Sequence, residues 1–361
     1  MKTIGIFLIN VCVIFSAFLF SGCATKKVVK ESTLIWPSPP EEPKIIYLSQ
    51  HRGDRDYDKK ASMVDMFIGK SVMRSNKNLV KPYGAESYGN KYYVADTAQA
   101  TVFVFDTNSS VEKPLTFIGQ NSSVRLALPV DLAIAKKGEE VYVSDAKLRK
   151  VFVFNQQGRL LRAIGKKNEF MRPSGIAVND ELQRLYVVDT KGHCVKVYSS
   201  QGEYLFTFGK RGEAEATFNF PTNIAVDRRN GNVAIVDTQN FRVQIFDQDG
   251  NFISTFGDLG DRPGMFARPK GVAIDTEGHI YVADSAFSNI QIFNDKGELL
   301  LYFGNKGARH GQFVLLSGLN IDEQDRLLVA DSFNGRIQVF QYVSDQWKRN
   351  NPDKYQELLG K

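Results

Sequence analysis

Four short apolar runs follow one another between Phe220 and Gly257, and polar segments separate them. Each run is rich in β-branched and aromatic residues; the four are Asn223–Val226, Val233–Val236, Val243–Phe246 and Phe252–Phe256. Asn, Asp and Gly, which tight turns favour, fill the segments between them. The pattern predicts four antiparallel strands in one small twisted sheet. Because a single sheet of this size cannot bury both of its faces, we expect the unit to repeat.

The unit does repeat, and an Asp closes the second strand of each copy. These residues are separated by 49, 44, 48, 47 and 47 positions, and they are Asp96, Asp145, Asp189, Asp237, Asp284 and Asp331. A strand-like run ends directly before each Asp, and another begins soon after it. A sustained period near 47 residues with four strands per copy is typical of a β-propeller.

Short motifs recur at fixed places in these copies. One strand opens with Pro173-Ser174-Gly175-Ile176-Ala177-Val178, and a later strand type reads Asn334-Gly335-Arg336-Ile337-Gln338-Val339-Phe340. Together with a closing Phe-Gly, these motifs resemble NHL repeats over residues 79–342. The resemblance implies an all-β fold, a six-bladed β-propeller of four-stranded repeats with short accessory helices at both ends. It says little about activity, because proteins with this fold range from scaffolds to lyases.

The recurring Asp residues have a structural interpretation. An Asp after a strand accepts backbone N–H bonds from the following turn. Arg242 and Arg336 follow their Asp by five residues, so they can pair with it or lie along the strand edge. We therefore interpret the six Asp residues as turn supports; the alternative is a metal-binding or catalytic set.

The sixth copy is incomplete. It stops after Phe340-Gln341-Tyr342 and lacks a fourth strand. An open sheet edge leaves backbone groups unpaired, so a strand from elsewhere is needed. Lys44–Leu48 is a strand-like run before the first copy. We predict that residues 44–50 complete the sixth blade of a propeller that spans residues 44–343.

The N-terminal residues predict export. A lysine precedes a nearly unbroken apolar run, Ile4–Phe20, which is typical of a signal peptide. Phe20-Ser21-Gly22-Cys23 resembles the bacterial lipobox, in which the cysteine is lipidated. We expect a signal peptide over residues 1–22 and a lipidated Cys23 on a proline-rich tether, residues 23–43. The alternative is an uncleaved anchor helix. Ala24 resembles the outer-membrane sorting pattern, so the predicted location is the outer membrane of a bacterial cell envelope.

Accessory helices are predicted beside the propeller. Met63, Met66 and Phe67 recur at helical spacing within residues 61–78. At the other end, Asn351-Pro352 is typical of a helix start, and we expect one C-terminal helix within residues 344–361.

Charge is predicted to divide between the two faces of the propeller. The 361-residue chain has a net charge of +6. The connections between blades and the turns between second and third strands share one face, here called the loop face; the other turns form the turn face. Acidic pairs such as Glu139-Glu140 and Asp322-Glu323 fall on the turn face. The alternative to a polarised molecule is scattered solubilising charge. The basic residues predicted to form a binding surface on the loop face are Arg149, Lys150, Lys166, Lys167, Arg172, Lys210, Arg211, Arg242, Arg268, Lys270, Arg309 and Arg336.

The expected partner of the loop face is an envelope protein or an anionic polysaccharide. Export argues against nucleic acid, although the basic face resembles the RNA-binding surface of some eukaryotic NHL proteins. The lipid anchor supplies the membrane contact, and we expect a monomer. Aromatic loop residues would add apolar anchors wherever they do not pack between blades: Phe170, Phe218, Phe220, Phe266, Phe313, Phe241, Phe287 and Phe333.

Candidate catalytic residues are few. His193 and His310 lie on the predicted loop face in different blades. Lyases of similar fold hold a central metal with several histidines, and this sequence has no matching set. We interpret Cys194 as a packed core thiol. The prediction is a non-catalytic module with no metal and no cofactor other than the lipid on Cys23. The alternative is a metal-dependent lyase or lactonase-like enzyme with Ca²⁺ or Zn²⁺ at the central channel.

Overall fold

The computed structural model describes residues 34–56, 77–107, 115–119, 124–135, 137 and 139–360. The predicted signal peptide, Cys23, the first part of the tether and most of the predicted helix over residues 61–78 lie outside the described residues. Asn78 is described, and it forms an isolated β-bridge with Gly53. The helix expected within residues 61–78 stays a prediction, and Asn78 itself is not part of it.

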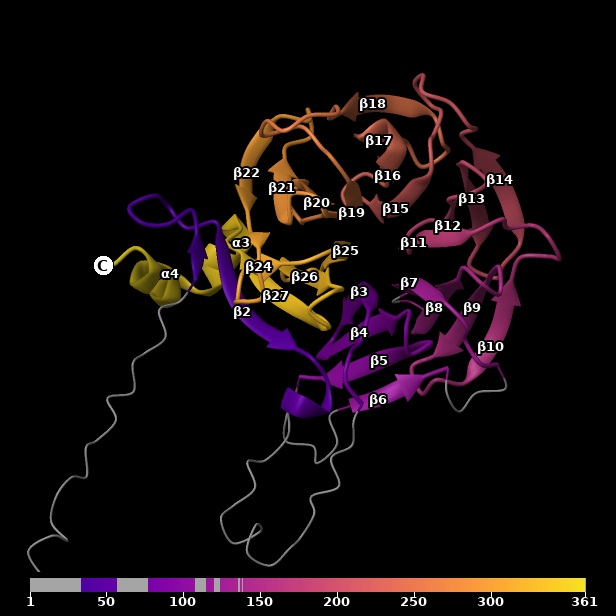
Figure 1. Cartoon of the computed structure of the whole chain (residues 1–361), viewed down its shortest axis with the longest axis horizontal. Helices are drawn as coiled ribbons and strands as arrows, with labels where there is room; N and C mark the ends of the chain where they lie inside the picture. Colours follow the sequence, from indigo (N-terminus) through magenta and orange to yellow (C-terminus); the bar gives the residue numbers. More distant parts are fainter. Residues whose placement is uncertain are drawn as a thin grey trace, which may run out of the picture. The chain divides into compact units, whose positions relative to one another are not determined.

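Six antiparallel sheets form the blades of a six-bladed β-propeller (Figure 1). Blade 1 contains β3 (Pro82–Tyr88), β4 (Lys91–Asp96), β5 (Thr101–Asp106) and β6 (Leu115–Ile118). Blade 2 contains β7 (Pro129–Ala135), β8 (Glu140–Asp145), β9 (Lys150–Asn155) and β10 (Leu160–Ile164). Blade 3 contains β11 (Pro173–Asn179), β12 (Arg184–Asp189), β13 (Cys194–Ser199) and β14 (Tyr204–Phe208). The first strand of each blade contacts the first strand of the next, so these strands line a central channel.

The remaining blades follow the same order. Blade 4 contains β15 (Pro221–Val226), β16 (Val233–Asp237), β17 (Arg242–Phe246) and β18 (Phe252–Phe256). Blade 5 contains β19 (Pro269–Ile274), β20 (Ile280–Asp284), β21 (Asn289–Phe293) and β22 (Leu299–Phe303). Blade 6 contains β25 (Leu316–Ile321), β26 (Arg326–Asp331) and β27 (Arg336–Tyr342), together with β2 (Ile45–His51) and the short β1 (Ile35–Trp36).

The hydrophobic core lies between the blades. Each core cluster is shared by two neighbours: Val153 of blade 2 packs with Val187 of blade 3, and Val94 of blade 1 packs with Leu328 of blade 6. Alternating β-branched and aromatic residues give each blade two apolar faces, and each face is buried against the next blade. The same packing therefore continues around the whole ring.

Strand β2 is the fourth strand of blade 6, although it precedes blade 1 in the sequence (Figure 1). It pairs antiparallel with β27 from Ile45 opposite Tyr342 to His51 opposite Ile337. The register shifts between Tyr47 and Ser49, so Leu48 is the extra residue of a β-bulge. Blade 6 thus joins the two ends of the propeller and covers the edge of β27.

The C-terminal segment forms two helices, α3 (Asp345–Asn350) and α4 (Pro352–Leu358), so the prediction of one helix is wrong. Ser344 caps α3 by accepting a hydrogen bond from the Trp347 N–H at 3.2 Å. Asn351 has φ −135° and ψ 55°, which ends α3, and Pro352 then starts α4. No helix among the described residues is long and apolar enough to span a membrane.

The loops that lead into blades 4, 5 and 6 share one construction. Gly209, Gly257 and Gly304 have φ of +82°, +87° and +89°, and a Cβ on any of them would lie within 2.3–2.5 Å of a phenylalanine ring. The rings belong to Phe218, Phe266 and Phe313, which are fully buried. Only glycine combines this φ with this close contact, which explains the Phe-Gly that closes the repeats. In the last loop, β23 (Asn305–Lys306) pairs parallel with β24 (Gln312–Phe313).

This construction corrects the prediction for some of the aromatic loop residues. Phe170 and the three phenylalanines of the preceding paragraph are core residues, so they are not available to a partner. Phe220 and Phe333 remain exposed on the loop face, with 39% and 71% of their surface accessible. Of the eight predicted phenylalanines these two are exposed, and Phe241 and Phe287 are half-buried.

Candidate functional site

The repeated Asp residues fix the start of the first strand in each blade. In blade 5, Asp284 Oδ2 accepts hydrogen bonds from the N–H groups of Ala267 (2.7 Å) and Arg268 (3.0 Å). Its Oδ1 accepts from Ala286 (2.8 Å) and Phe287 (3.1 Å) in the next turn. All six side chains have no exposed surface. The hydrogen bonds to the turn agree with the turn-support interpretation, and the carboxylate also positions the residue that precedes the first strand.

The residue directly before the first strand of each blade alternates in type around the channel. In blades 1, 3 and 5 it is a cation, and in blades 2, 4 and 6 it is apolar. In blade order the residues are Lys81, Leu128, Arg172, Phe220, Arg268 and Leu315. Cations therefore alternate with apolar side chains at the loop-face end of the channel.

A cavity of about 530 Å³ opens at this end of the channel, and we call it the channel mouth. None of the described residues that line it is acidic. Its wall combines cations, hydroxyls and apolar side chains: Lys81, Tyr83, Thr97, Leu128, Val130, Arg172, Ser174, Thr190, Phe220, Thr222, Thr238, Gln239, Arg268 and Lys270. The volume is in the range of small-molecule sites in proteins.

The cations of the channel mouth act on one another. Burial lowers the pKa of Lys270, and the charges of Arg268, Lys81 and Arg172 lower it further. The Lys270 ammonium lies 5.7 Å from the centre of the Tyr83 ring, a cation–π distance. Burial raises the pKa of Tyr83, whereas Arg172 lowers it. Within the described part of the chain, no carboxylate forms an ion pair with any of these four cations. The site thus concentrates positive charge without an internal counterion.

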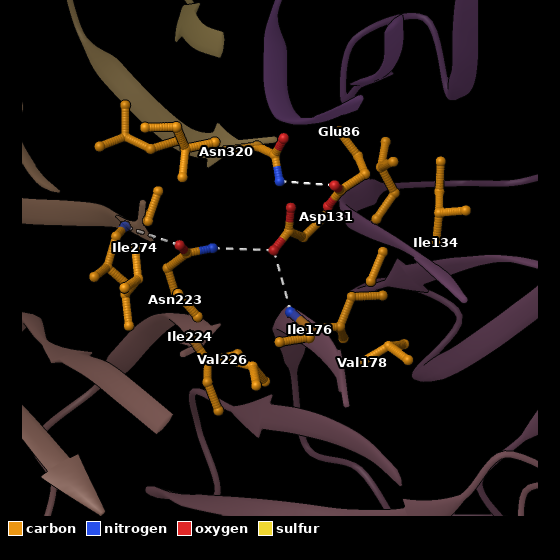
Figure 2. A pocket seen from close by; sticks show the side chains of 18 of the residues that line it. Glu86, Asp131, Ile134, Ile176, Val178, Asn223, Ile224, Val226, Ile274 and Asn320 are labelled. Carbon is orange, nitrogen blue, oxygen red and sulfur yellow. Dashed lines mark hydrogen bonds between the residues drawn. The ribbon is translucent and has the colours of Figure 1, made fainter. Parts of the chain in front are cut away.

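A layer of side chains that includes Asp131 and Asn223 lies between the mouth and a second cavity, whose lining Figure 2 shows. Asp131 Oδ2 accepts hydrogen bonds from the Asn223 side chain (3.0 Å) and the Ile176 N–H (3.1 Å), while Asn223 Oδ1 accepts from the Val272 N–H (3.0 Å). Burial raises the pKa of Asp131 to about 7. Asp131 and Asn223 come from blades 2 and 4, so this pair bridges blades that are not neighbours.

The neighbouring blades leave room for these two side chains. The corresponding positions in blades 1, 3, 5 and 6 are Gly84, Gly175, Gly271 and Gly318, and a Cβ on any of them would lie within 2.2–2.6 Å of an atom of another blade. Beyond this layer lies a smaller cavity of about 100 Å³, where Asn320 Nδ2 donates to Glu86 Oε1 at 2.7 Å (Figure 2). The channel mouth and this smaller cavity are therefore two separate cavities along the channel.

Eight of the basic residues predicted for the binding surface are at the mouth or on the exposed loops around it. Arg172, Arg268 and Lys270 line the mouth. The other five are exposed on the loops: Lys166, Lys167, Lys210, Arg211 and Arg309. Together these residues make the loop face basic.

The remaining four predicted residues hold the loops in place. Arg336 is fully buried and pairs with Asp331 at 2.8 Å, so its assignment to the binding surface is wrong. Arg242 pairs with Asp237 at 3.0 Å and donates to the Ala214 and Thr217 carbonyls. Arg149 donates to the Phe170 carbonyl at 2.6 Å, and Lys150 donates to the Gly165 carbonyl. Their polar groups are directed to the inter-blade loops and not to a ligand.

Sequence reasoning missed Lys81, the hydroxyls of the channel mouth and Asp131. Lys81 has a signal in the sequence, because it precedes Pro82 as Arg172 precedes Pro173 and Arg268 precedes Pro269. Aligning the copies on that proline would have found it. Asp131 and Asn223 stand where other copies have glycine, and this exception was also visible in the sequence.

The carboxylates of the turn face are largely engaged in structure. Asp275 accepts hydrogen bonds from the His279 ring (2.9 Å) and the Tyr281 hydroxyl (3.0 Å), and this contact raises the pKa of His279. Glu277 accepts from the Tyr342 hydroxyl at 2.7 Å and from the N–H of Asp345 at the start of α3 at 2.7 Å. Asp275 and Glu277 therefore serve the structure of the turn face and its contact with α3.

The candidate catalytic and metal-binding side chains of the loop face do not share one site. His193 is buried, and its Nδ1 accepts from the Phe220 N–H at 3.2 Å. His310 is exposed and stacks on Tyr47 with 4.7 Å between ring centres. Cys194 is buried, and burial raises the pKa of its thiol to about 11. Among the described residues, no three His, Cys, Asp or Glu side chains come together as a possible metal site.

The profile of the NHL repeat matches residues 170–198, 218–246 and 266–293. The chain carries NHL repeats. Each matched segment begins at the buried loop phenylalanine and ends with the third strand, so it contains both the Asp and the strand start that position the channel mouth. No curated protein matches the sequence.

Solved structures share the fold of this NHL propeller. A protein of unknown function from Bacteroides thetaiotaomicron VPI-5482 is 14% identical, with a TM-score of 0.60 over 74% of this chain and 71% of that one. Virginiamycin B lyase from Staphylococcus aureus is 13% identical, with a TM-score of 0.54 over 73% and 95%. Hydrazine synthase from Kuenenia stuttgartiensis is 13% identical, with a TM-score of 0.53 over 76% and 99%. Identities this low establish the fold alone.

Proposed function

We propose that this NHL propeller is a non-catalytic binding module of the bacterial cell envelope, anchored by a lipid on Cys23. In this proposal its loop face binds an envelope protein or an anionic polysaccharide. The observation that carries the proposal is the set of exposed cations on that face, arranged around a mouth that no described carboxylate lines. Unpaired positive charge of this kind lowers the stability of a lone chain but attracts a negative partner.

The location of the cations suits recognition. They lie on loops that the blades hold rigidly, and binding residues are often placed in this way. A field of one sign on one face accelerates encounter with an anionic partner and orients it. The exposed Phe220 and Phe333 on the same face supply apolar contact area.

Affinity capture from envelope extracts tests the proposal. The test variant replaces Lys166, Lys167, Lys210 and Arg211 by Glu, and the control variant replaces Lys137, Arg159, Lys296 and Arg349 by Glu. The control residues are also exposed but lie in turn-face turns or in α3. We expect the test variant to lose its partners and the control variant to retain them, with capture by the wild type weakening as salt rises.

Two results would contradict this function. Equal capture by the wild type and the test variant would show that these loop-face cations do not bind the partner. Saturable binding of Ca²⁺ or Zn²⁺ at the channel mouth, coupled to turnover of a lactone or a similar substrate, would instead favour the alternative of a metal-dependent lyase or lactonase-like enzyme.

A further inference from the structure

The channel mouth has the features of a site for one small, highly charged group. It collects Lys81, Arg172, Arg268 and Lys270 from blades 1, 3 and 5 around a single cavity of about 530 Å³. Repulsion among them is not relieved by any ion pair within the described residues. Strands of the propeller core carry or flank all four, so their backbone positions around the cavity are fixed.

We propose that the channel mouth binds the phosphate of a small phosphomonoester between Arg172 and Arg268, with Lys81 and Lys270 completing the charge. This inference rests on the proposed function, in which the loop face attracts anionic partners, and adds a small ligand that the centre of that face recognises. A soluble sugar phosphate and the headgroup of a phosphorylated lipid present the same group.

The charge of the site favours a phosphomonoester over a carboxylate or a phosphodiester. A phosphomonoester carries about −1.5 to −2 charges at neutral pH and has three terminal oxygens that accept hydrogen bonds. The other two groups carry a single charge each. Planar guanidinium groups such as those of Arg172 and Arg268 match the oxygens of phosphate in pairs. Four cations thus need a ligand with more than one charge.

The rest of the wall suits the carbon skeleton that bears the phosphate. Leu128 and Val130 of blade 2 and Phe220 of blade 4 form apolar parts of the wall between the cationic blades. The hydroxyls are fixed by one another: Ser174 contacts Thr190 at 2.6 Å, and Thr222 contacts Thr238 at 2.7 Å. A cavity of this volume is larger than a phosphate ion, so the organic part of the ligand fits within it.

Carboxyl groups lie close to the mouth but do not line it. Asp96, Asp189 and Asp284 are buried and accept hydrogen bonds from the backbone N–H groups of Lys81, Arg172 and Arg268. Asp131 is in the layer beneath the mouth. Its raised pKa, about 7, leaves it only partly ionised at neutral pH, so it repels an anion less than an ordinary carboxylate would. Tyr83, whose pKa is raised by burial, is neutral under the same conditions. Among the described residues, the charged groups that line the cavity are the four cations alone.

Calorimetric titration of the full-length protein in detergent tests the proposal. The probes are glucose 1-phosphate, dihexanoyl phosphatidic acid and, as a single-charge comparison, dimethyl phosphate. We expect saturable binding of at least one phosphomonoester and binding of dimethyl phosphate at least about ten-fold weaker. Preference for glucose 1-phosphate identifies a soluble ligand, and preference for the phosphatidic acid identifies a lipid headgroup. Equal binding of dimethyl phosphate, or no binding of either monoester, would overturn the proposal.

Variants of residues that line the mouth provide a second test of phosphomonoester binding. Arg172→Gln and Arg268→Gln should each weaken phosphomonoester binding by about ten-fold or more, the usual effect of losing a charged hydrogen bond. Lys296→Gln, on the turn face, should leave the affinity unchanged. A third measurement does not depend on variants: bound phosphomonoester should slow acetylation of Lys81 and Lys270, read by peptide mass spectrometry, but not that of Lys296. Unslowed acetylation at saturating ligand would also overturn the proposal.

These measurements separate the inference from the function on which it rests. The titration uses purified protein whose outer loops are unchanged, whereas partner capture is tested with Lys166, Lys167, Lys210 and Arg211. Loss of capture in the loop variant together with absent phosphomonoester binding would leave the proposed function standing and reject only the ligand group.

Discussion

Arg242 and Arg336 occupy equivalent places in blades 4 and 6, yet their surroundings differ. Both pair with the repeated Asp five residues earlier, but the Arg242 side chain retains 13% of its exposure and the Arg336 side chain none. Strand β2 accounts for part of the difference, because Gln50 Oε1 accepts a hydrogen bond from Arg336 at 2.9 Å. Arg336 also donates to the backbone carbonyls of Ala308, Arg309 and Gln312.

Replacing Arg336 by Ala should therefore destabilise the protein much more than replacing Arg242 by Ala. The first change leaves the buried Asp331 charge without its partner, which typically costs about 3–5 kcal/mol. The second also removes the ion pair of a buried carboxylate, Asp237, but the Arg242 position is partly exposed and water can reach it, so this change should cost about 1–3 kcal/mol. Urea unfolding of the two variants measures both losses. Equal losses would mean that burial beneath β2 does not strengthen the interaction.

The burial of Arg336 illustrates a limit of sequence reasoning at this scale. The motif Asn-x-Arg reads the same in blades 4 and 6, at Asn240–Arg242 and Asn334–Arg336. The cover over Arg336 comes from a strand nearly 300 positions earlier, since the bond to Gln50 spans 286 residues. A local pattern predicts the ion pair, but only the tertiary arrangement decides its exposure.

Asp131 should make the stability of the protein depend on pH. Its pKa is raised from 3.8 to about 7, so the folded state holds a proton that the unfolded state has lost between these values. The stability of the wild type should therefore fall as pH rises through this window, by up to about 4 kcal/mol from this group. In Asp131→Asn this contribution disappears, while an amide oxygen can still accept from Ile176 and Asn223.

Urea unfolding of wild type and Asp131→Asn at a series of pH values checks this expectation. Other buried carboxyls with raised pKa, such as Asp237 and Asp325, contribute equally to both proteins, so the difference between the two curves isolates Asp131. Parallel curves would show that Asp131 remains ionised in the folded protein.

At the scale of elements, strand β2 should carry much of the stability of blade 6. Ile45 is fully buried in the core between blades 5 and 6, whereas Leu48, at the bulge of the same strand, is 39% exposed. Ile45→Ala should cost about 2–5 kcal/mol. Leu48→Ala should change stability by no more than about 0.5 kcal/mol. Similar losses in the two variants would indicate that β2 is not docked as described.

Deleting residues 44–50 is the stronger test of the same element. The edge of β27 would lose its pairing from Ile337 to Tyr342, and blade 6 would present open backbone groups. We expect a lower thermal transition and new cleavage sites in blade 6 under limited proteolysis. An unchanged transition temperature would mean that the ring does not need this strand to close.

The elements differ in how far the sequence determines them. The strands and the repeat of four per blade follow from alternating apolar runs and turn residues, which are local signals. The place of β2 follows from counting strands, because one blade lacked a partner for its third strand. The bulge at Leu48 and the break between α3 and α4 depend on packing and backbone angles that no apolar pattern records.

At the scale of the whole molecule, topology alone predicts which residues share the loop face. It does not predict which of them converge on the channel. That depends on the register of each first strand, and the hydrogen bonds of the repeated Asp residues set this register. Arg172 and Arg268 therefore meet at the mouth, whereas Lys166 lies on an exposed loop outside it although it is close to Arg172 in sequence.

The four cations at the mouth should measurably lower the folding stability of the ligand-free protein. Lys270 is half-buried and its pKa is lowered by burial and by three neighbouring cations, so its charge opposes folding. Lys270→Met keeps an apolar stem against Tyr83 and removes that charge. At low salt the variant should be more stable than wild type, on the order of 1 kcal/mol.

Salt distinguishes this origin from a packing effect. The Debye length falls from about 30 Å at 0.01 M to about 3 Å at 1 M, so the advantage of Lys270→Met should shrink as salt is added. Lys296→Met, which removes an exposed charge on the turn face, should show a much smaller change at any salt concentration. Saturating phosphomonoester should have the opposite effect: it binds only the folded mouth and should stabilise wild type more than Lys270→Met. If Lys270→Met were less stable than wild type at low salt, Lys270 would stabilise the folded protein. That result would contradict a cation cluster kept for ligand binding at the expense of stability.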